Sequence, residues 1–391
     1  MKDNAWKNKS FILRLDGISV KITILFALSL AGSLIFLNRW VVTDLGFHSF
    51  GRVWQYYVSY FDYGFVRRAF FGTVLDVTGL NKAISNPYFF SYALYSIKII
   101  ILSLIVFIYV IKNKVFTNVY GYIVVFFSPA FILQAGYLTG NQDLELTIIL
   151  AIVFLYVRSW SVLLFLSIVG LLIHELYIFS FPAALLSVYI KRNKGFDIVS
   201  REVVSSIVIC LIVLAVLMLT AFAGVNVPKE EFEATMAQKM GVAAYNHSLW
   251  SGYFEVFSSV DSNLNTGVNA LLQIPEKIKY TIIPILYALL WALSNSYYSQ
   301  VDLWKKTLIL LALILPISAI FVASDFYRWV GMSANLSILY AISYSSIKEA
   351  FIPKKVFVVL FLFSFVAPFG SANLERPFPA HQLIIEKAFN H

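Results

Sequence analysis

Long apolar runs are the sequence feature that most constrains this chain. They extend for about 20 residues with almost no charge, which is about the length that crosses the hydrocarbon core of a bilayer as a helix. The chain is 60% hydrophobic and 13% charged, whereas soluble domains carry about 25% charged residues. Membrane β-strands would alternate apolar and polar residues instead. The runs therefore predict an all-α, polytopic integral membrane protein.

The apolar runs divide the chain into about eleven predicted spans. One stretch, 160–190, holds two of them only if the chain turns near His174 and Glu175, and Pro182 is expected to kink the second. No soluble segment of domain size interrupts the runs, so residues 1–391 are interpreted as a single transmembrane domain. The predicted spans are 19–37, 89–111, 116–135, 144–157, 160–174, 175–190, 202–223, 280–297, 307–323, 328–346 and 355–368.

The basic residues predict the orientation of the chain. Lysines and arginines gather in the loops on the side of the N-terminus, for example at Lys112, Lys191, Arg192 and Lys305. The positive-inside rule places these loops and the N-terminus in the cytoplasm. An odd number of spans then places the C-terminus on the periplasmic side. The net charge of +9 is explained by this topology, so no nucleic-acid partner is expected.

Two periplasmic loops are predicted to be long, 38–88 and 224–279. The first contains an aromatic stretch, 53–61, which is expected to lie in the membrane interface, where Trp and Tyr are enriched. The second contains a charged segment after Pro228, which predicts the start of a helix.

The first long loop also holds the strongest candidate for an anion site. Asp44 and Asp62 precede the paired arginines Arg67 and Arg68, and glycines flank the pair. Arginine forms a rigid bidentate fork for phosphate, and glycine lets backbone approach a ligand closely. The alternative is an interfacial helix whose arginines contact lipid headgroups.

Three further polar groups are expected at the same side of the membrane. Asn141, Asp143 and Glu145 lie in a short loop and at the helix start that follows it, where helix capping and complementation of the helix dipole are the alternative explanation. His174 and Glu175 are either proton-transfer groups or a buried pair that satisfies itself. Asp325 and Arg328 are neighbours on one helical face and form either a ligand site or an intrahelical ion pair. The basic side shows no comparable set, so the four groups together predict one periplasmic cavity.

The sequence contains no metal-binding motif and no phosphate-cradling loop of the Walker type. Its single cysteine, Cys210, excludes a disulfide within the chain.

The segment 61–68, His174 with Glu175, and the segment 325–328 resemble bacterial membrane enzymes that act on polyprenyl-linked sugars. Two groups share this architecture: the O-antigen or capsule repeat-unit polymerases (the Wzy family) and the GT-C glycosyltransferase superfamily. The latter carry a catalytic acid in the first extracytoplasmic loop, which Asp44 or Asp62 matches. The resemblance implies a multi-pass protein of the bacterial inner membrane with a periplasmic active site.

The same resemblance implies roles and partners. Arg67, Arg68 and Arg328 would hold the phosphate of a lipid-linked oligosaccharide, while Asp62 or Glu175 would act as the base. No cofactor is required, although Asp44, Asp62 and Asp143 would supply oxygen ligands for a divalent cation in a GT-C enzyme. Membrane lipids and other polysaccharide-assembly proteins are the expected further partners.

Two rival classes of function are compatible with the sequence. A transporter or flippase of a glycan precursor would use Lys98, His174 and Glu175 along a proton or substrate path. A membrane acyltransferase would use His174 as its catalytic histidine. The polar groups favour one edge of the membrane and no internal repeat is present, which favours the glycosyltransferase over transport.

Overall fold

The structure, a computed structural model, is all helix in the part of the chain that it describes. It describes residues 17–38, 53–80, 82, 86–116, 118–132, 142–193, 195–222, 227–241, 274–321, 326–347 and 352–366, and five single positions between 253 and 269. These residues form fourteen α-helices and three 3-10 helices, in agreement with the predicted all-α class.

Three helices are long and apolar enough to cross a membrane. They are α4 (Pro87–Asn113), α10 (Ser200–Phe222) and α15 (Leu303–Ile314), the last of which continues into the 3-10 helix η6 (Leu315–Phe321). The prediction of about eleven spans is therefore wrong as a count. A helix that rises 1.5 Å per residue needs about 20 residues to cross the hydrocarbon core, and most of the other apolar runs form shorter helices.

Helices nevertheless form at every predicted run. The runs fall on α1 (Gly17–Asn38), α5 (Val119–Phe126), α7 (Asp143–Leu155), α8 (Trp160–Ile173), α9 (Phe181–Asn193), α14 (Ile274–Tyr298), α16 (Phe326–Ser345) and α17 (Lys354–Val366), in addition to the three long helices.

The stretch 160–190 folds back on itself, as predicted. Helix α8 ends at Ile173, His174 is extended, and the 3-10 helix η4 (Glu175–Phe179) leads into α9. Arg192 at the end of α9 donates to the carbonyl of Arg158, just before α8, at 3.1 Å. The expected kink at Pro182 is absent, because this proline lies in the first turn of α9, where its missing N–H has no helical partner to lose.

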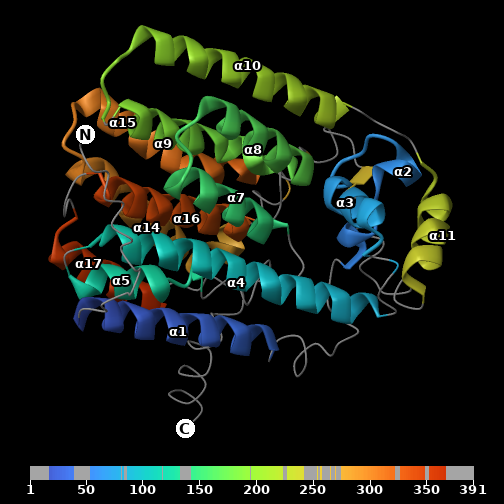
Figure 1. Cartoon of the computed structure of the whole chain (residues 1–391), viewed down its shortest axis with the longest axis horizontal. Coiled ribbons are helices and arrows are strands. Elements are labelled where there is room, and N and C mark those ends of the chain that lie inside the picture. Colours follow the sequence, from blue (N-terminus) through green and yellow to red (C-terminus); the bar gives the residue numbers. More distant parts are fainter. Residues whose placement is uncertain are drawn as a thin grey trace, which may run out of the picture.

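Helix α16 forms the centre of the bundle and packs against α7, α14, α15 and η6. Its side chains are buried from Arg328 to Ser345. Helix α10 lies on the outside of the bundle (Figure 1), and only 17% of its apolar window is buried. An apolar face of this size in contact with water would be unusual for a soluble protein, whereas lipid would cover it.

An apolar groove separates α10 from α15. It encloses about 740 Å³ and is lined almost entirely by apolar side chains of α9, α10 and α15, including Leu186, Cys210, Leu211 and Leu308.

A helical cap lies at one end of the bundle, beyond the start of α4 (Figure 1). It consists of the 3-10 helix η3 (Val53–Tyr56) and the helices α2 (Tyr60–Tyr63), α3 (Phe70–Thr78) and α11 (Lys229–Met240). Helix α11 begins after Pro228, as predicted. The two long loops therefore meet at the same end of the molecule.

Most of the aromatic stretch 53–61 is buried inside the protein, whereas Phe61 at its end is exposed. Trp54, Tyr56 and Tyr57 are fully buried within the protein. The segment approaches α3 so closely that a Cβ on Gly72 would lie 2.0 Å from the carbonyl oxygen of Val58. Tertiary packing thus buries aromatic side chains that were expected to lie in the membrane interface.

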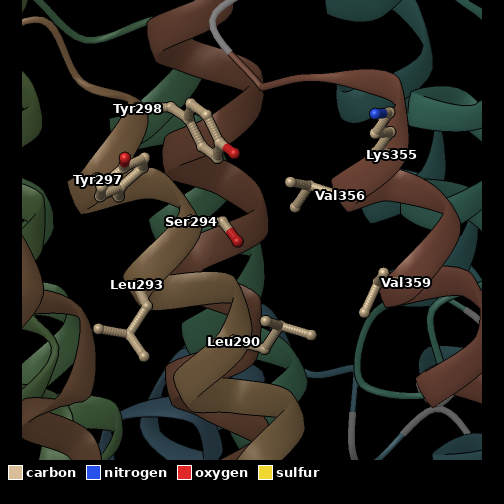
Figure 2. Close-up of a pocket in the computed structure, with 8 residues that line it drawn as sticks. All are labelled: Leu290, Leu293, Ser294, Tyr297, Tyr298, Lys355, Val356 and Val359. Carbon is tan, nitrogen blue, oxygen red and sulfur yellow. The ribbon is translucent and has the colours of Figure 1, made fainter.

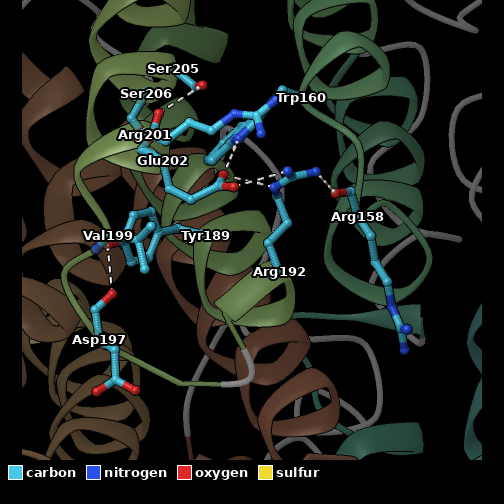
Figure 3. Close-up of polar contacts among 10 residues, drawn as sticks. All are labelled: Arg158, Trp160, Tyr189, Arg192, Asp197, Val199, Arg201, Glu202, Ser205 and Ser206. Carbon is cyan, nitrogen blue, oxygen red and sulfur yellow. Dashed lines mark hydrogen bonds and ion pairs between the residues drawn. The ribbon is translucent and has the colours of Figure 1, made fainter.

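The opposite end of the bundle is basic and is tied together by one carboxylate. Glu202 accepts hydrogen bonds from Arg192 at 2.8 and 3.0 Å and from the indole of Trp160 at 2.5 Å (Figure 3). Lys191 donates to the carbonyls of Val153 and Phe154, at the end of α7, at 2.5 and 2.9 Å. The basic end therefore carries a polar cluster that the sequence analysis did not expect, and its contacts join the ends of α7, α8, α9 and α10.

Candidate functional site

Arg68 and Glu175 form an ion pair between the cap and the break after α8. Arg68 Nη2 lies 3.3 Å from Glu175 Oε1, and both side chains are largely buried. Arg68 has a φ of 61°, a left-handed conformation that is uncommon for a residue with a Cβ. Such strain is retained when the surroundings fix it, and it concentrates at functional sites.

His174 connects this pair to α16. Its Nδ1 lies 3.5 Å from Glu175 Oε2 and accepts the N–H of Leu176 at 3.3 Å. The imidazole meets the indole of Trp329 edge to face, with ring centroids 5.9 Å apart. Its Nε2 is buried and has no hydrogen-bond partner among the described residues, and the same holds for Glu175 Oε2, so both atoms could bind a ligand.

Asp143 and Arg328 form the second pair. Arg328 donates from Nε and Nη2 to the two carboxylate oxygens of Asp143, each at 2.6 Å. Gln142 donates to the backbone carbonyl of Arg68 at 3.5 Å, which brings this pair beside the first. Asp143 thus binds across to α16 in addition to lying in the first turn of α7, where a carboxylate also complements the helix dipole.

A third pair lies deeper in the bundle. Lys98 in α4 binds Glu145 in α7 and donates to the hydroxyl of Tyr56 at 2.9 Å. The ammonium lies 4.5 Å from the ring centre of Tyr56 and 4.6 Å from that of Phe71. From the sequence, Lys98 was expected to act only in the transport alternative. As a single charge inside an apolar run, Lys98 indicates a partner on another helix.

These contacts define one buried cluster, hereafter the charged cluster, at the cap end of the bundle. Its three basic and three acidic side chains balance in charge. Burying an ion pair is expensive, and well-packed apolar residues often stabilise a fold as well or better. Three such buried pairs, one of which includes Lys98 in the long apolar helix α4, therefore indicate a function. The charged cluster consists of Lys98, Glu145, Arg68, Glu175, Asp143 and Arg328, with His174 and Gln142 beside them.

Asp62 belongs to a separate cluster in the cap. Lys239 of α11 lies between two carboxylates, 2.5 Å from Asp62 Oδ2 and 2.8 Å from Asp76 Oδ2, and also donates to the carbonyl of Tyr57 at 3.3 Å. Burial raises the pKa of Tyr57 and of Tyr60 to about 12, so these neighbouring phenols stay protonated near neutral pH. Asp62 thus connects the two long loops.

The structure brings together Arg68, Asp143, His174, Glu175 and Arg328 of the predicted site. Arg67 precedes Arg68 directly and is half-buried. Asp44, Asn141 and Asp325 lie outside the described residues. Arg328 binds Asp143 from another helix, and its predicted pairing with Asp325 involves a residue outside the described ranges.

The carboxylates proposed for a divalent cation do not converge among the described residues. Asp62 binds Lys239 and Asp143 binds Arg328, so each is neutralised by a different cation in a different cluster. Within the described ranges, no group of three or more His, Cys, Asp or Glu side chains has the geometry of a metal site.

The chain matches no protein-family model, no curated protein and no solved structure.

Proposed function

We propose that this chain is an inner-membrane glycosyltransferase that acts on polyprenyl-phosphate-linked saccharides at its cap end, which would face the periplasm. The observation that carries this proposal is the charged cluster, because it places two buried arginines, a histidine and carboxylates at one end of a membrane bundle. Transfer from a lipid phosphate needs cations for the leaving group and a base for the acceptor.

The arginines would bind the leaving phosphate. In this structure the guanidinium groups of Arg68 and Arg328 bind Glu175 and Asp143. These carboxylates occupy the sites that phosphate oxygens would take, since arginine binds both anions with the same fork. Arg67 would add a further positive charge at the mouth of the site.

Glu175 would be the base. It lies inside the charged cluster, whereas Asp62 binds Lys239 in the cap. As the phosphate enters, it would take Arg68 from Glu175. The Glu175 carboxylate would then accept the proton of the acceptor hydroxyl while the hydroxyl oxygen attacks the anomeric carbon. The bond from that carbon to the phosphate oxygen breaks, and the lipid phosphate leaves on the arginines.

Of the two classes of enzyme, we propose that the chain is an O-antigen or capsule repeat-unit polymerase. A GT-C enzyme that adds one sugar from a polyprenyl-phosphate donor is the alternative. The position of Glu175 in the charged cluster supports the polymerase. Asp62, one of the two acids of the first extracytoplasmic loop that the GT-C class could use, binds Lys239 in the cap, and the other, Asp44, lies outside the described residues.

The test is the surface-glycan ladder of a strain that lacks the gene, complemented with wild type, Arg68→Ala or Arg201→Ala. Arg201 is exposed at the basic end and is the matched control. Loss of the ladder down to one repeat unit with Arg68→Ala alone would support the polymerase. An intact ladder with a missing side sugar would support the GT-C alternative. An unchanged glycan in the deletion strain would refute both.

The pair of Lys98 and Glu145 favours transport as a second candidate. A lysine that is buried in the middle of a long apolar helix and bound to a carboxylate is the arrangement expected on a proton path. Proteoliposomes that contain the wild type would then acidify when a precursor gradient is applied, and Lys98→Gln would abolish the signal. Wild-type vesicles without any proton flux would exclude this candidate.

A further inference from the structure

A second groove opens at the basic end of the bundle, between α14 and α17. It encloses about 390 Å³ and is lined by side chains from these two helices only. Figure 2 shows Ser294, Tyr298 and Lys355 turned toward the space between the helices. This groove lies far along the bundle from the charged cluster, which is at the cap end (Figure 1).

The groove changes from polar to apolar along its length. Tyr298 and Lys355 lie at its mouth, at the end of α14 and the start of α17. Farther along the helices it is lined by Leu290 and Val359. A polar mouth and an apolar interior match a molecule with a headgroup and a tail, and aromatic and basic side chains at the mouth are typical of a membrane interface.

The charge at the mouth selects the sign of the headgroup. Among the described residues, no carboxylate lines the groove. The ammonium of Lys306 lies 5.4 Å from the ring centre of Tyr297, and that of Lys354 lies 4.6 Å from the ring centre of Tyr120. Asp302, which directly precedes α15, is bound by Lys305 at 3.0 Å. In the part of the chain that the structure describes, the charges around the mouth are therefore mainly basic.

We propose that this groove binds an anionic phospholipid of the leaflet at the basic end. Its phosphate would lie between Lys355 and the hydroxyls of Tyr298 and Ser294, and one acyl chain would run along Leu290 and Val359. Free phosphate would match only the mouth, and a zwitterionic lipid would lack the net charge that Lys355 attracts. The site is independent of the proposed transferase reaction, because it uses none of its residues.

The experiment is native mass spectrometry of the purified full chain after incubation with equal amounts of phosphatidylglycerol and phosphatidylcholine in detergent. The wild type is expected to retain one phosphatidylglycerol molecule preferentially. One lysine near a membrane surface is worth about 1 kcal/mol toward anionic lipid, so Lys355→Gln should lower that retention about fivefold.

Lys354→Gln is the matched control, because it removes the same charge one residue away, outside the groove lining. It is expected to keep the bound phosphatidylglycerol. Equal loss in both variants would overturn the proposal in favour of a diffuse surface charge. Retention in both would overturn it as well.

A second variant tests the tail. Leu290→Trp fills the apolar interior and is expected to abolish retention while leaving the basic mouth in place. An unchanged phosphatidylglycerol signal in Leu290→Trp, or displacement of the lipid by inorganic phosphate in the wild type, would show that only a phosphate site is present and would overturn the proposal of a phospholipid.

Discussion

Several charged side chains of this protein are buried, and Asp143 with Arg328 is a pair joined by two hydrogen bonds. Two charge-assisted hydrogen bonds of 2.6 Å join side chains that are both nearly inaccessible. Removal of one partner takes from the other buried charge the two hydrogen bonds of this pair, whereas removal of both leaves two neutral groups. The contribution of the pair to stability can therefore be measured with single and double variants, separately from its contribution to function.

We expect Asp143→Asn or Arg328→Gln alone to lower the free energy of unfolding by about 3–5 kcal/mol. The double variant should regain part of this loss, because no charge is left unpaired. Thermal unfolding in detergent, followed by circular dichroism, measures the difference. Additive losses in the double variant would contradict direct pairing.

Gly72 provides a second prediction at this scale. Gly72→Ala places a Cβ 2.0 Å from the carbonyl oxygen of Val58, and this backbone cannot move aside as a flexible side chain would. Overpacking of this kind costs about 1–3 kcal/mol, measured as a lower unfolding temperature. Gly195→Ala is the control, since a Cβ there meets no heavy atom within 4 Å; an equal loss in the control would refute the steric explanation.

At the scale of elements, the positions of helices were predictable and their lengths were not. Apolar runs locate helices because burial and backbone hydrogen bonding require them. The breaks depend on tertiary contacts instead. Helix α8 ends where Gly170 packs against the ring of Tyr177, and the turn at His174 then points Glu175 toward Arg68. A single sequence does not reveal such contacts.

Helix α11 makes polar contacts with the first loop through Lys239. Lys239→Gln removes the cation that lies between Asp62 and Asp76, so the two carboxylates repel each other and α11 should open more often. Hydrogen exchange of the α11 amides is expected to rise about tenfold or more, corresponding to about 1.4 kcal/mol or more of lost local stability. Lys229→Gln is the control, because Lys229 binds only the exposed Glu233 on its own helix; a similar rise there would contradict a specific role for Lys239.

The whole molecule separates a cap end from a basic end, and this polarity was predictable from the distribution of Lys and Arg. Which groups pair was not. Asp143 and Arg328 lie 185 residues apart in sequence, so only the fold brings them together. Sequence alone located most of the candidate groups at one end, but it did not indicate that Asp62 binds Lys239 or that Lys98 pairs with Glu145.

For the whole molecule, we predict that the cap end faces the periplasm and the basic end faces the cytoplasm. In a Cys210→Ser background, Gln238→Cys on α11 and Asp302→Cys before α15 place one exposed thiol at each end. In intact cells, a membrane-impermeant maleimide is expected to label Gln238→Cys through the periplasm and to leave Asp302→Cys unlabelled until the cells are lysed. Labelling of both thiols in intact cells, or of Asp302→Cys alone, would contradict the assigned topology.

The groove between α10 and α15 contains a natural attachment point for a spectroscopic label. Cys210 lines that groove and is the single cysteine of the protein. Because thiol chemistry has one target, a small fluorophore or spin label attached to the natural sequence would lie between the most peripheral long helix and the rest of the bundle. Its emission or line shape, followed as a lipid-linked saccharide is titrated in, would record whether that helix moves during turnover, with no engineered substitution to complicate the signal.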